Sequence, residues 1–146
     1  SRLDVACQIP TARGIFASCE PLLGPIDLRP YFGDRWTSPV TWVIGGGESG
    51  GKARPTHPEW ARTLRDDICE AGGDFNWKQW GEWVTEEQAP NDIVLPSRSH
   101  LPWAIECRDL DGRVDDIEGD LTAVYKTGKK AAGRMLDGRT WDEGPV

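Results

Sequence analysis

The stretch Thr41–Trp83, TWVIGGGESGGKARPTHPEWARTLRDDICEAGGDFNWKQWGEW, decides the fold because it carries the pattern of a complete βαβ unit. Residues 41–44 are all β-branched or aromatic, and none of them is charged. This composition is typical of a buried strand in a parallel sheet. The glycine-rich segment GGGESGG follows directly at residues 45–51. We therefore expect a first strand that ends in a long glycine-rich loop.

A helix is predicted between this loop and the next strand. His57-Pro58 places proline at the first helical position, where its missing N–H costs nothing. Apolar side chains then recur every four residues, at Trp60, Leu64 and Ile68, and form one stripe. Gly72-Gly73 provides the left-handed residues that commonly end a helix.

Asp74–Trp80 alternates in the manner of a second strand, with Phe75 and Trp77 on one side. The crossover between two such strands is expected to be parallel and right-handed. Proteins with this topology bind their ligands beyond the carboxyl ends of the strands. The glycine-rich loop and the segment Lys78–Trp83 (KQWGEW) both lie at that edge. The sequence thus predicts an α/β fold with any functional site at this edge.

The flanking segments complete one predicted domain, residues 1–146, with its βαβ centre at 41–83 and an irregular, loop-rich part at 84–146. Residues 14–20 read as a further strand, which Pro21 ends. In the second part we expect an exposed loop at 84–96, a short strand within 101–108, a strand or loop at 121–125 and a helix at 131–136. Trp141 is expected to anchor the C-terminal segment.

Composition limits the classes of function. The chain has 146 residues, a net charge of -7 and a pI near 4.8, which makes nonspecific binding to nucleic acid or anionic membranes unlikely. We find no apolar run long enough to span a bilayer and no signal peptide, so a cytoplasmic protein is expected. The four cysteines have no metal-site spacing and are interpreted as buried thiols.

The glycine-rich loop is the strongest local signal for binding, although it matches neither the dinucleotide fingerprint nor the P-loop. Its glycines could let backbone N–H groups approach a ligand, or could simply permit a flexible connection. Glu20 and Glu48 occupy equivalent strand ends and could act as bases or accept from an amino group. The alternative is a cap, turn or ion-pair role.

Other residues are open to two interpretations as well. Arg54 and His57 could hold an anion before the helix, or His57 could only cap it. Lys126–Lys130 (KTGKK) could meet a phosphate or form a solvated face. The candidate ligand-binding residues are Glu20, Gly46, Gly47, Glu48, Ser49, Arg54, His57, Lys78 and Gln79. Trp80 and Trp83 are the candidates for a protein interface, and the alternative is that the tryptophans of this run pack in the core and at its rim.

Four stretches, residues 18–28, 42–72, 78–83 and 128–143, together resemble the C-terminal half of a phage-associated family of unknown function, the gene-product thirty-seven/sixty-eight family, which is considered radical-SAM-like. The resemblance implies a partial (β/α) barrel in which the strands ending at Glu20, Glu48 and Lys78 face a cofactor or substrate. It also implies a cysteine-rich segment that holds a [4Fe–4S] cluster, and this chain has no such segment.

Three hypotheses follow. The preferred one is a phage-encoded, noncatalytic domain in the host cytoplasm that binds a host or phage protein or forms a homo-oligomer. A second is the C-terminal piece of a radical-SAM-type enzyme, in which case S-adenosylmethionine and the cluster require a segment supplied from elsewhere. The third is a small-ligand-binding domain that uses the glycine-rich loop. No cofactor is expected for this chain alone.

Overall fold

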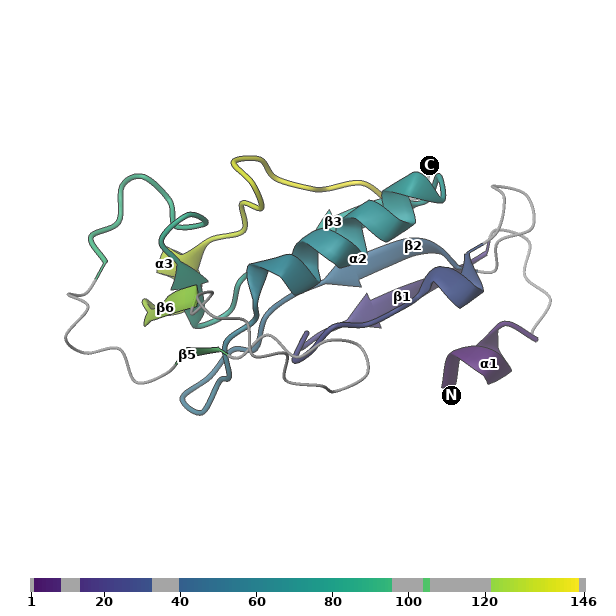
Figure 1. Cartoon of the computed structure of the whole chain (residues 1–146), viewed down its shortest axis with the longest axis horizontal. Helices are drawn as coiled ribbons and strands as arrows, with labels where there is room; N and C mark the ends of the chain where they lie inside the picture. The colour runs from purple at the N-terminus through teal and green to yellow at the C-terminus, as the bar shows by residue number, and fades with distance from the viewer. Residues whose placement is uncertain (1, 9–13, 33–39, 96–103, 106–121, 145–146) are drawn as a thin grey trace.

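The computed structural model of the chain describes residues 2–8, 14–32, 40–95, 104–105 and 122–144 (Figure 1). Its elements, in chain order, are α1 (Arg2–Ala6), β1 (Ile15–Cys19), the 3-10 helix η1 (Arg29–Tyr31), β2 (Val40–Gly45), α2 (Pro58–Glu70), β3 (Asp74–Trp77), β4 (Trp83–Thr85), β5 (Ala104–Ile105), β6 (Thr122–Lys126) and α3 (Lys129–Ala132). Residues 110–120, which are rich in aspartate and glutamate, lie outside the described residues.

The central sheet is parallel, with the strand order β1-β2-β3. Its register places Ala17 beside Val43, and Val43 beside Phe75. The three predicted strands are present, although the third ends at Trp77 and not at Trp80, and the parallel pairing predicted for β2 and β3 is confirmed. Among the described residues the strands form no closed barrel, and the fold is mixed α/β.

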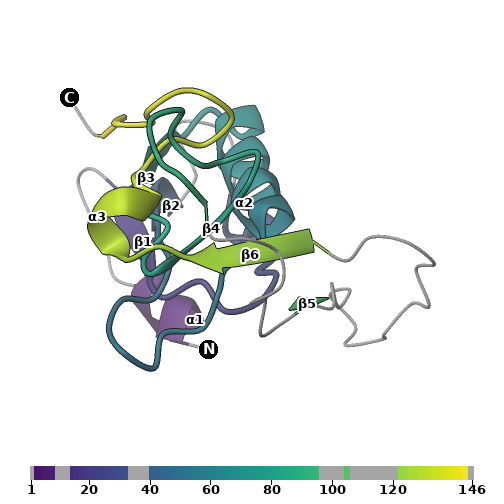
Figure 2. The same ribbon diagram turned by 90° about the vertical axis from the view of Figure 1, so that its left-hand side faces the viewer.

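A second, antiparallel sheet has the order β4-β6-β5 and lies beyond the carboxyl ends of the parallel strands (Figures 1 and 2). The predicted exposed loop at 84–96 is thus wrong in its first residues, since Val84 and Thr85 are buried in β4. They are buried because β6, about forty residues further along the chain, pairs with them. Of the two alternatives for 121–125, a strand or a loop, the strand is observed as β6.

The helix α2 forms where its sequence pattern predicted. The side chain of His57 accepts a hydrogen bond from the backbone N–H of Glu59 at 3.2 Å, which caps the helix start. Gly72 follows the helix with a φ of 78°. The helix predicted at 131–136 is shorter and earlier, because Gly133 ends α3 with a φ of 71°. Residues at the ends of the helices therefore determine where α2 begins and where α2 and α3 end.

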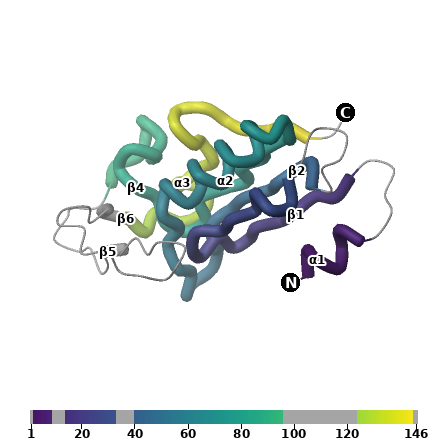
Figure 3. Tube along the Cα trace, turned by 45° about the vertical axis from the view of Figure 1, so that its right-hand side comes forward, coloured from purple at the N-terminus to yellow at the C-terminus, as the bar shows by residue number. Residues whose placement is uncertain are grey.

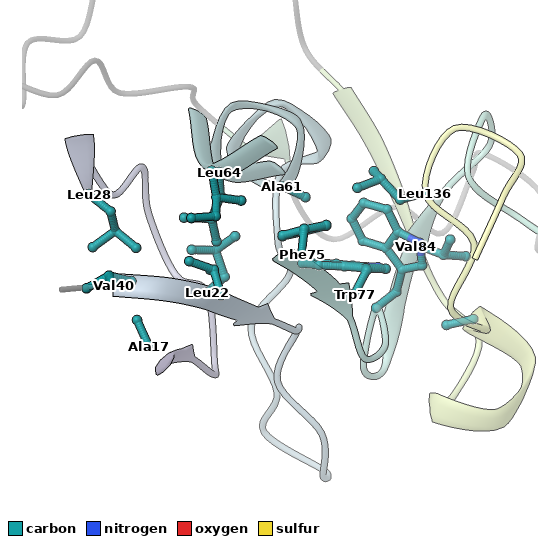
Figure 4. Close-up of a cluster of buried hydrophobic side chains, with 14 residues drawn as sticks. Ala17, Leu22, Leu28, Val40, Ala61, Leu64, Phe75, Trp77, Val84 and Leu136 are labelled. Atoms are coloured by element: carbon teal, nitrogen blue, oxygen red, sulfur yellow. The ribbon is translucent and has the colours of Figure 1, made fainter. Parts of the chain in front are cut away.

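α2 covers one face of the parallel sheet (Figures 1 and 3). Its buried side chains Ala61, Leu64 and Ile68 pack on that face. Figure 4 shows Leu64 pointing from the helix towards Leu22, with Phe75 and Trp77 alongside. Burial of each large side chain contributes roughly 1.5–3 kcal/mol relative to exposure. This cluster is the main core of the described chain.

The segment after α3 returns along β3. The backbone N–H of Trp77 donates to the carbonyl oxygen of Trp141 at 3.0 Å, and Asn76 forms an antiparallel bridge with Asp142. The Trp141 ring contacts Phe75 edge-on at 5.9 Å and lies under the Arg139 guanidinium at 3.4 Å. The predicted anchoring role of Trp141 is confirmed.

Asp137 joins the same segment to α2. Its carboxylate accepts hydrogen bonds from Arg62 at 2.8 Å, Arg65 at 2.5 Å and the Gln88 side chain at 2.8 Å. The Arg62 hydrogen bond, above all, holds the pKa of the Asp137 carboxyl well below its ordinary value. The Gln88 side chain also accepts from the Asp137 backbone N–H, so this contact fixes both side chain and backbone.

Within the described part of the chain, no helix has the length and apolar character that a membrane crossing requires.

Candidate functional site

The glycine-rich loop and the Lys78–Trp83 segment run side by side at the carboxyl edge of the parallel sheet. The N–H of Lys78 donates to the carbonyl oxygen of Gly45 at 2.9 Å, and the N–H of Gly47 donates to that of Gln79 at 2.8 Å. The N–H of Glu82 then donates to the carbonyl oxygen of Glu48 at 3.0 Å. The two segments are thus bonded backbone to backbone over their length.

This close approach explains why two of the positions are glycine. A Cβ atom at Gly47 would lie 1.9 Å from the carbonyl oxygen of Trp80. A Cβ at Gly81, which has a φ of 81°, would lie 2.0 Å from that of Glu48. Both contacts are with backbone, which side-chain rotation cannot relieve. These glycines therefore serve the approach of the chain to itself.

Gly46 faces a side chain instead. A Cβ at this position would lie 2.6 Å from Oε1 of Glu20, so the glycine leaves room for that carboxylate. The tip of the loop has other partners: the N–H of Gly50 donates to Oε1 of Glu82 at 3.1 Å, and Lys126 Nζ donates to the carbonyl oxygen of Gly51 at 2.8 Å. The interpretation as a merely flexible connection does not fit these contacts.

Glu48 and Arg54 form a two-point ion pair, with distances of 2.9 and 2.8 Å. The backbone N–H of Arg54 also donates to the Glu48 carboxylate at 2.7 Å. Because of the Arg54 hydrogen bonds, the pKa of Glu48 falls to about 2. Glu48 is therefore a poor base, and its ion-pair alternative is the arrangement observed. The positive charge of Arg54 is balanced by the Glu48 carboxylate, and His57 is buried and caps the helix. Neither side chain is therefore placed as a free anion ligand.

Glu20 and Lys78 meet at the carboxyl ends of β1 and β3. Lys78 Nζ lies 3.1 Å from Oε2 of Glu20, and the Ser18 hydroxyl donates to the same oxygen at 3.3 Å. The Glu20 side chain is 19% exposed and that of Lys78 is 57% exposed, so the carboxylate is the more enclosed partner. The pair can accept from an amino group at Glu20 or meet an anionic group at Lys78.

Gln79 and Ser49 form the adjacent polar pair. Nε2 of Gln79 donates to the Ser49 hydroxyl at 3.2 Å and, more weakly, to the carbonyl oxygen of Gly47 at 3.4 Å. Four of the predicted residues, Glu20, Ser49, Lys78 and Gln79, are thus brought to one edge. Nearby Cys19 is no nucleophile, since burial raises the pKa of its thiol to about 11.

The two tryptophans predicted at an exposed interface are buried, and that prediction is wrong for this structure. Trp80 is 1% exposed and Trp83 is 6% exposed. Each indole N–H donates to a backbone carbonyl oxygen, that of Met135 at 2.6 Å and that of Ala53 at 2.7 Å, respectively. Each therefore joins segments within the chain, and neither side chain is free to anchor a partner.

The face of the parallel sheet opposite α2 is a feature that the sequence reasoning missed. The alternation of each strand sends Phe16, Ser18, Trp42, Ile44 and Asn76 to this side. Phe16 is 56% exposed, and its ring lies 5.5 Å from that of half-buried Trp42. We refer to this surface as the open face.

The residues present do not fit the iron–sulfur cluster that the resemblance implies. Among the described residues, no group of three histidine, cysteine or acidic side chains could hold a metal ion. Cys7, Cys19 and Cys69 are separate free thiols. Cys107 lies outside the described residues.

Comparison with known proteins identifies a matching family. The model of a family described as a protein of unknown function (DUF5131) matches residues 1–145. No curated protein matches the chain, and no solved structure matches it.

Proposed function

The chain belongs to this family of unknown function, and we propose that it is a noncatalytic binding domain whose open face receives a protein partner. Parallel sheets are normally covered on both faces. Here α2 covers one face, whereas the other leaves Phe16 exposed beside half-buried Trp42 and Ile44. Among the described residues, the exposed Phe16 ring on this face is the observation that carries the proposal.

A partial barrel accounts for this arrangement. In a (β/α) barrel the helices lie outside the strands, and the opposite face of the strands lines the interior. α2 then belongs to the outer layer, and the open face is one part of an inner wall. The resemblance to the second half of a phage-associated barrel family agrees with this interpretation and makes a host or phage protein in the cytoplasm the expected partner. A second copy of the chain is the simplest alternative occupant.

The test uses charged substitutions on the open face. Phe16→Asp and Ile44→Lys each place a charge on this apolar surface, and both should abolish capture of a specific partner or self-association. Val94→Asp is the matched control, because Val94 is 95% exposed and lies outside the open face. Capture from host lysate followed by mass spectrometry detects a partner, and analytical ultracentrifugation detects a second copy.

Association that depends on Phe16 and Ile44 but not on Val94 supports the proposal. A chain that remains monomeric and captures nothing in an open-face-dependent manner contradicts it.

The polar carboxyl edge favours a second candidate, in which the chain is one part of an enzyme pocket completed by another segment. The specific observation is the enclosed Glu20 carboxylate, which Ser18 and Lys78 orient beside the open face. Any S-adenosylmethionine or cluster chemistry would depend on that other segment. Glu20→Gln distinguishes the candidates, since it should leave partner capture intact and abolish the activity of the completed assembly.

A further inference from the structure

A pocket lies away from the open face, between the loop after β4 and the segment after β6. It is a pocket of about 700 Å³, within the range of roughly 300–1,000 Å³ that small-molecule sites occupy. Its walls are Pro90, Asp92 and Ile93 on one side and residues 127–131 on the other. The glycine-rich loop contributes nothing to it.

Both walls are held in place by the backbone. The N–H groups of Thr127 and Gly128 donate to the carbonyl oxygen of Glu82 at 3.0 and 3.1 Å. On the opposite wall the N–H of Ile93 donates to the carbonyl oxygen of Pro90 at 3.2 Å. The pocket is thus preformed, and binding there requires little ordering of the chain.

The charges around the pocket differ from those of the chain as a whole. Lys129 and Lys130 are exposed on its wall, and neither forms an ion pair with another described residue. Arg54, Arg62 and Lys78, by contrast, are each paired with a carboxylate. In a chain of net charge -7, two unpaired cations at one concave surface favour an anionic ligand.

Four further wall residues refine the class of ligand. Pro90 and Ile93 offer apolar contact, and the Asp92 carboxylate accepts hydrogen bonds but repels a bare anion. The Thr127 hydroxyl is buried without a hydrogen-bond partner in the described structure, which is an unusual arrangement for a wall residue. The ligand should therefore carry an anionic group, an apolar portion and a hydrogen-bond donor.

We propose that this pocket binds a small phosphorylated organic molecule, with the phosphate at Lys129 and Lys130, the apolar part against Pro90 and Ile93, and a hydroxyl or amino group at Asp92. The site is independent of the protein-binding function proposed for the open face.

The experiment is calorimetric titration of the full chain with adenosine monophosphate, adenosine and inorganic phosphate as probes. The monophosphate should bind saturably and more tightly than either of the other two, because only it satisfies both walls. The double variant Lys129→Ser, Lys130→Ser should weaken that binding at least about tenfold, which corresponds to about 1.4 kcal/mol. Lys52→Ser removes a similarly exposed cation outside the pocket and should change the Kd less than about twofold, since distant surface charges are largely screened.

Asp92→Ala separates the two parts of the ligand. Removal of the negative charge should strengthen the binding of inorganic phosphate, whereas loss of the carboxylate acceptor should weaken the binding of the monophosphate. In the unmodified chain, amide resonances of residues 127–131 should shift on titration, which gives a result even if a variant does not fold. The proposal is overturned if the monophosphate does not bind saturably, if Lys52→Ser weakens binding as much as the double variant, or if the shifted resonances lie elsewhere.

Discussion

The covered face and the open face of the parallel sheet are built from alternate residues of the same three strands. On the covered face, Val43 and Phe75 are fully buried beneath α2. On the open face, Phe16 is 56% exposed, and Ile44 and Asn76 are only partly buried. The first face is covered by a helix of the chain, whereas no helix among the described residues covers the second.

The difference shows how stability and binding are divided within one sheet. A core residue stabilises the fold because it is removed from water, whereas an exposed apolar residue gains that energy only on association. Substitutions on the two faces should therefore affect different measurements. Phe75 and Phe16 form a matched pair for this comparison, since they are the same residue type on opposite faces of the sheet.

The largest effect is expected at Phe75. Phe75→Ala leaves a cavity between α2 and Trp141 and should lower the free energy of unfolding by about 3–5 kcal/mol. Chemical denaturation followed by tryptophan fluorescence measures it. A loss below about 1 kcal/mol would show that the covered face does not carry the core.

The next-largest loss of stability is expected in the glycine-rich loop, which begins where β2 ends. Gly47→Ala forces Cβ against the carbonyl oxygen of Trp80 and should cost about 2–4 kcal/mol. Gly51→Ala is the matched control, because its Cβ would meet no atom within 4 Å. Thermal unfolding of both variants provides the comparison, and equal melting temperatures would contradict the structural role of Gly47.

A smaller effect is expected at Asp137, which fastens α2 over the covered face. Asp137→Asn weakens hydrogen bonds to two arginines and should cost about 1–2 kcal/mol, reduced by partial exposure to solvent. Because the pKa of the folded-state carboxyl is lowered, its contribution is present above the ordinary pKa near 3.8 and is lost as the pH falls below it.

Unfolding measured from neutral pH into this acidic range should therefore show a steeper loss of stability in the unmodified chain than in Asp137→Asn. If the free energies of unfolding of the two proteins fall equally with pH, Asp137 is not the source of the pH dependence.

The smallest effect on stability is expected at Phe16. Phe16→Ala removes one tilted ring contact with Trp42 and should cost less than about 1 kcal/mol. It should nevertheless weaken association through the open face. If Phe16→Ala and Phe75→Ala destabilise the chain equally, the two faces are not distinct and the proposed function loses its basis.

Much of the parallel unit could be predicted from sequence because its signals are local. The β-branched run at 41–44, the proline after His57 and the glycines after α2 each report the conformation of a few neighbouring residues. Alternation likewise placed Phe75 and Trp77 on the same side of the strand, and this side of β3 is the buried one. These features need no knowledge of the rest of the chain.

The remaining features depend on contacts between distant segments. β4 is a strand because β6 pairs with it, and Trp80 is buried because Met135 accepts its indole N–H. The glycines at 47 and 81 give the same sequence signal whether a ligand or another backbone approaches them. The Asp137 contact was also missed, although Arg62 and Arg65 one helical turn apart and the Asp-Gly turn were visible hints.

The contacts of residues 135–142 have a consequence for the order of folding during synthesis. Trp77 and Trp80, which lie at the end of the βαβ unit, bond to Trp141 and Met135, about sixty residues further along the chain. A nascent chain that has already produced all three parallel strands therefore still lacks the edge of its sheet. We compare ribosome-bound chains from which only residues up to 132 have emerged with chains from which residue 142 has also emerged. We expect a protease to digest the first much faster than the second. Equal resistance would show that the βαβ unit folds without its closing segment.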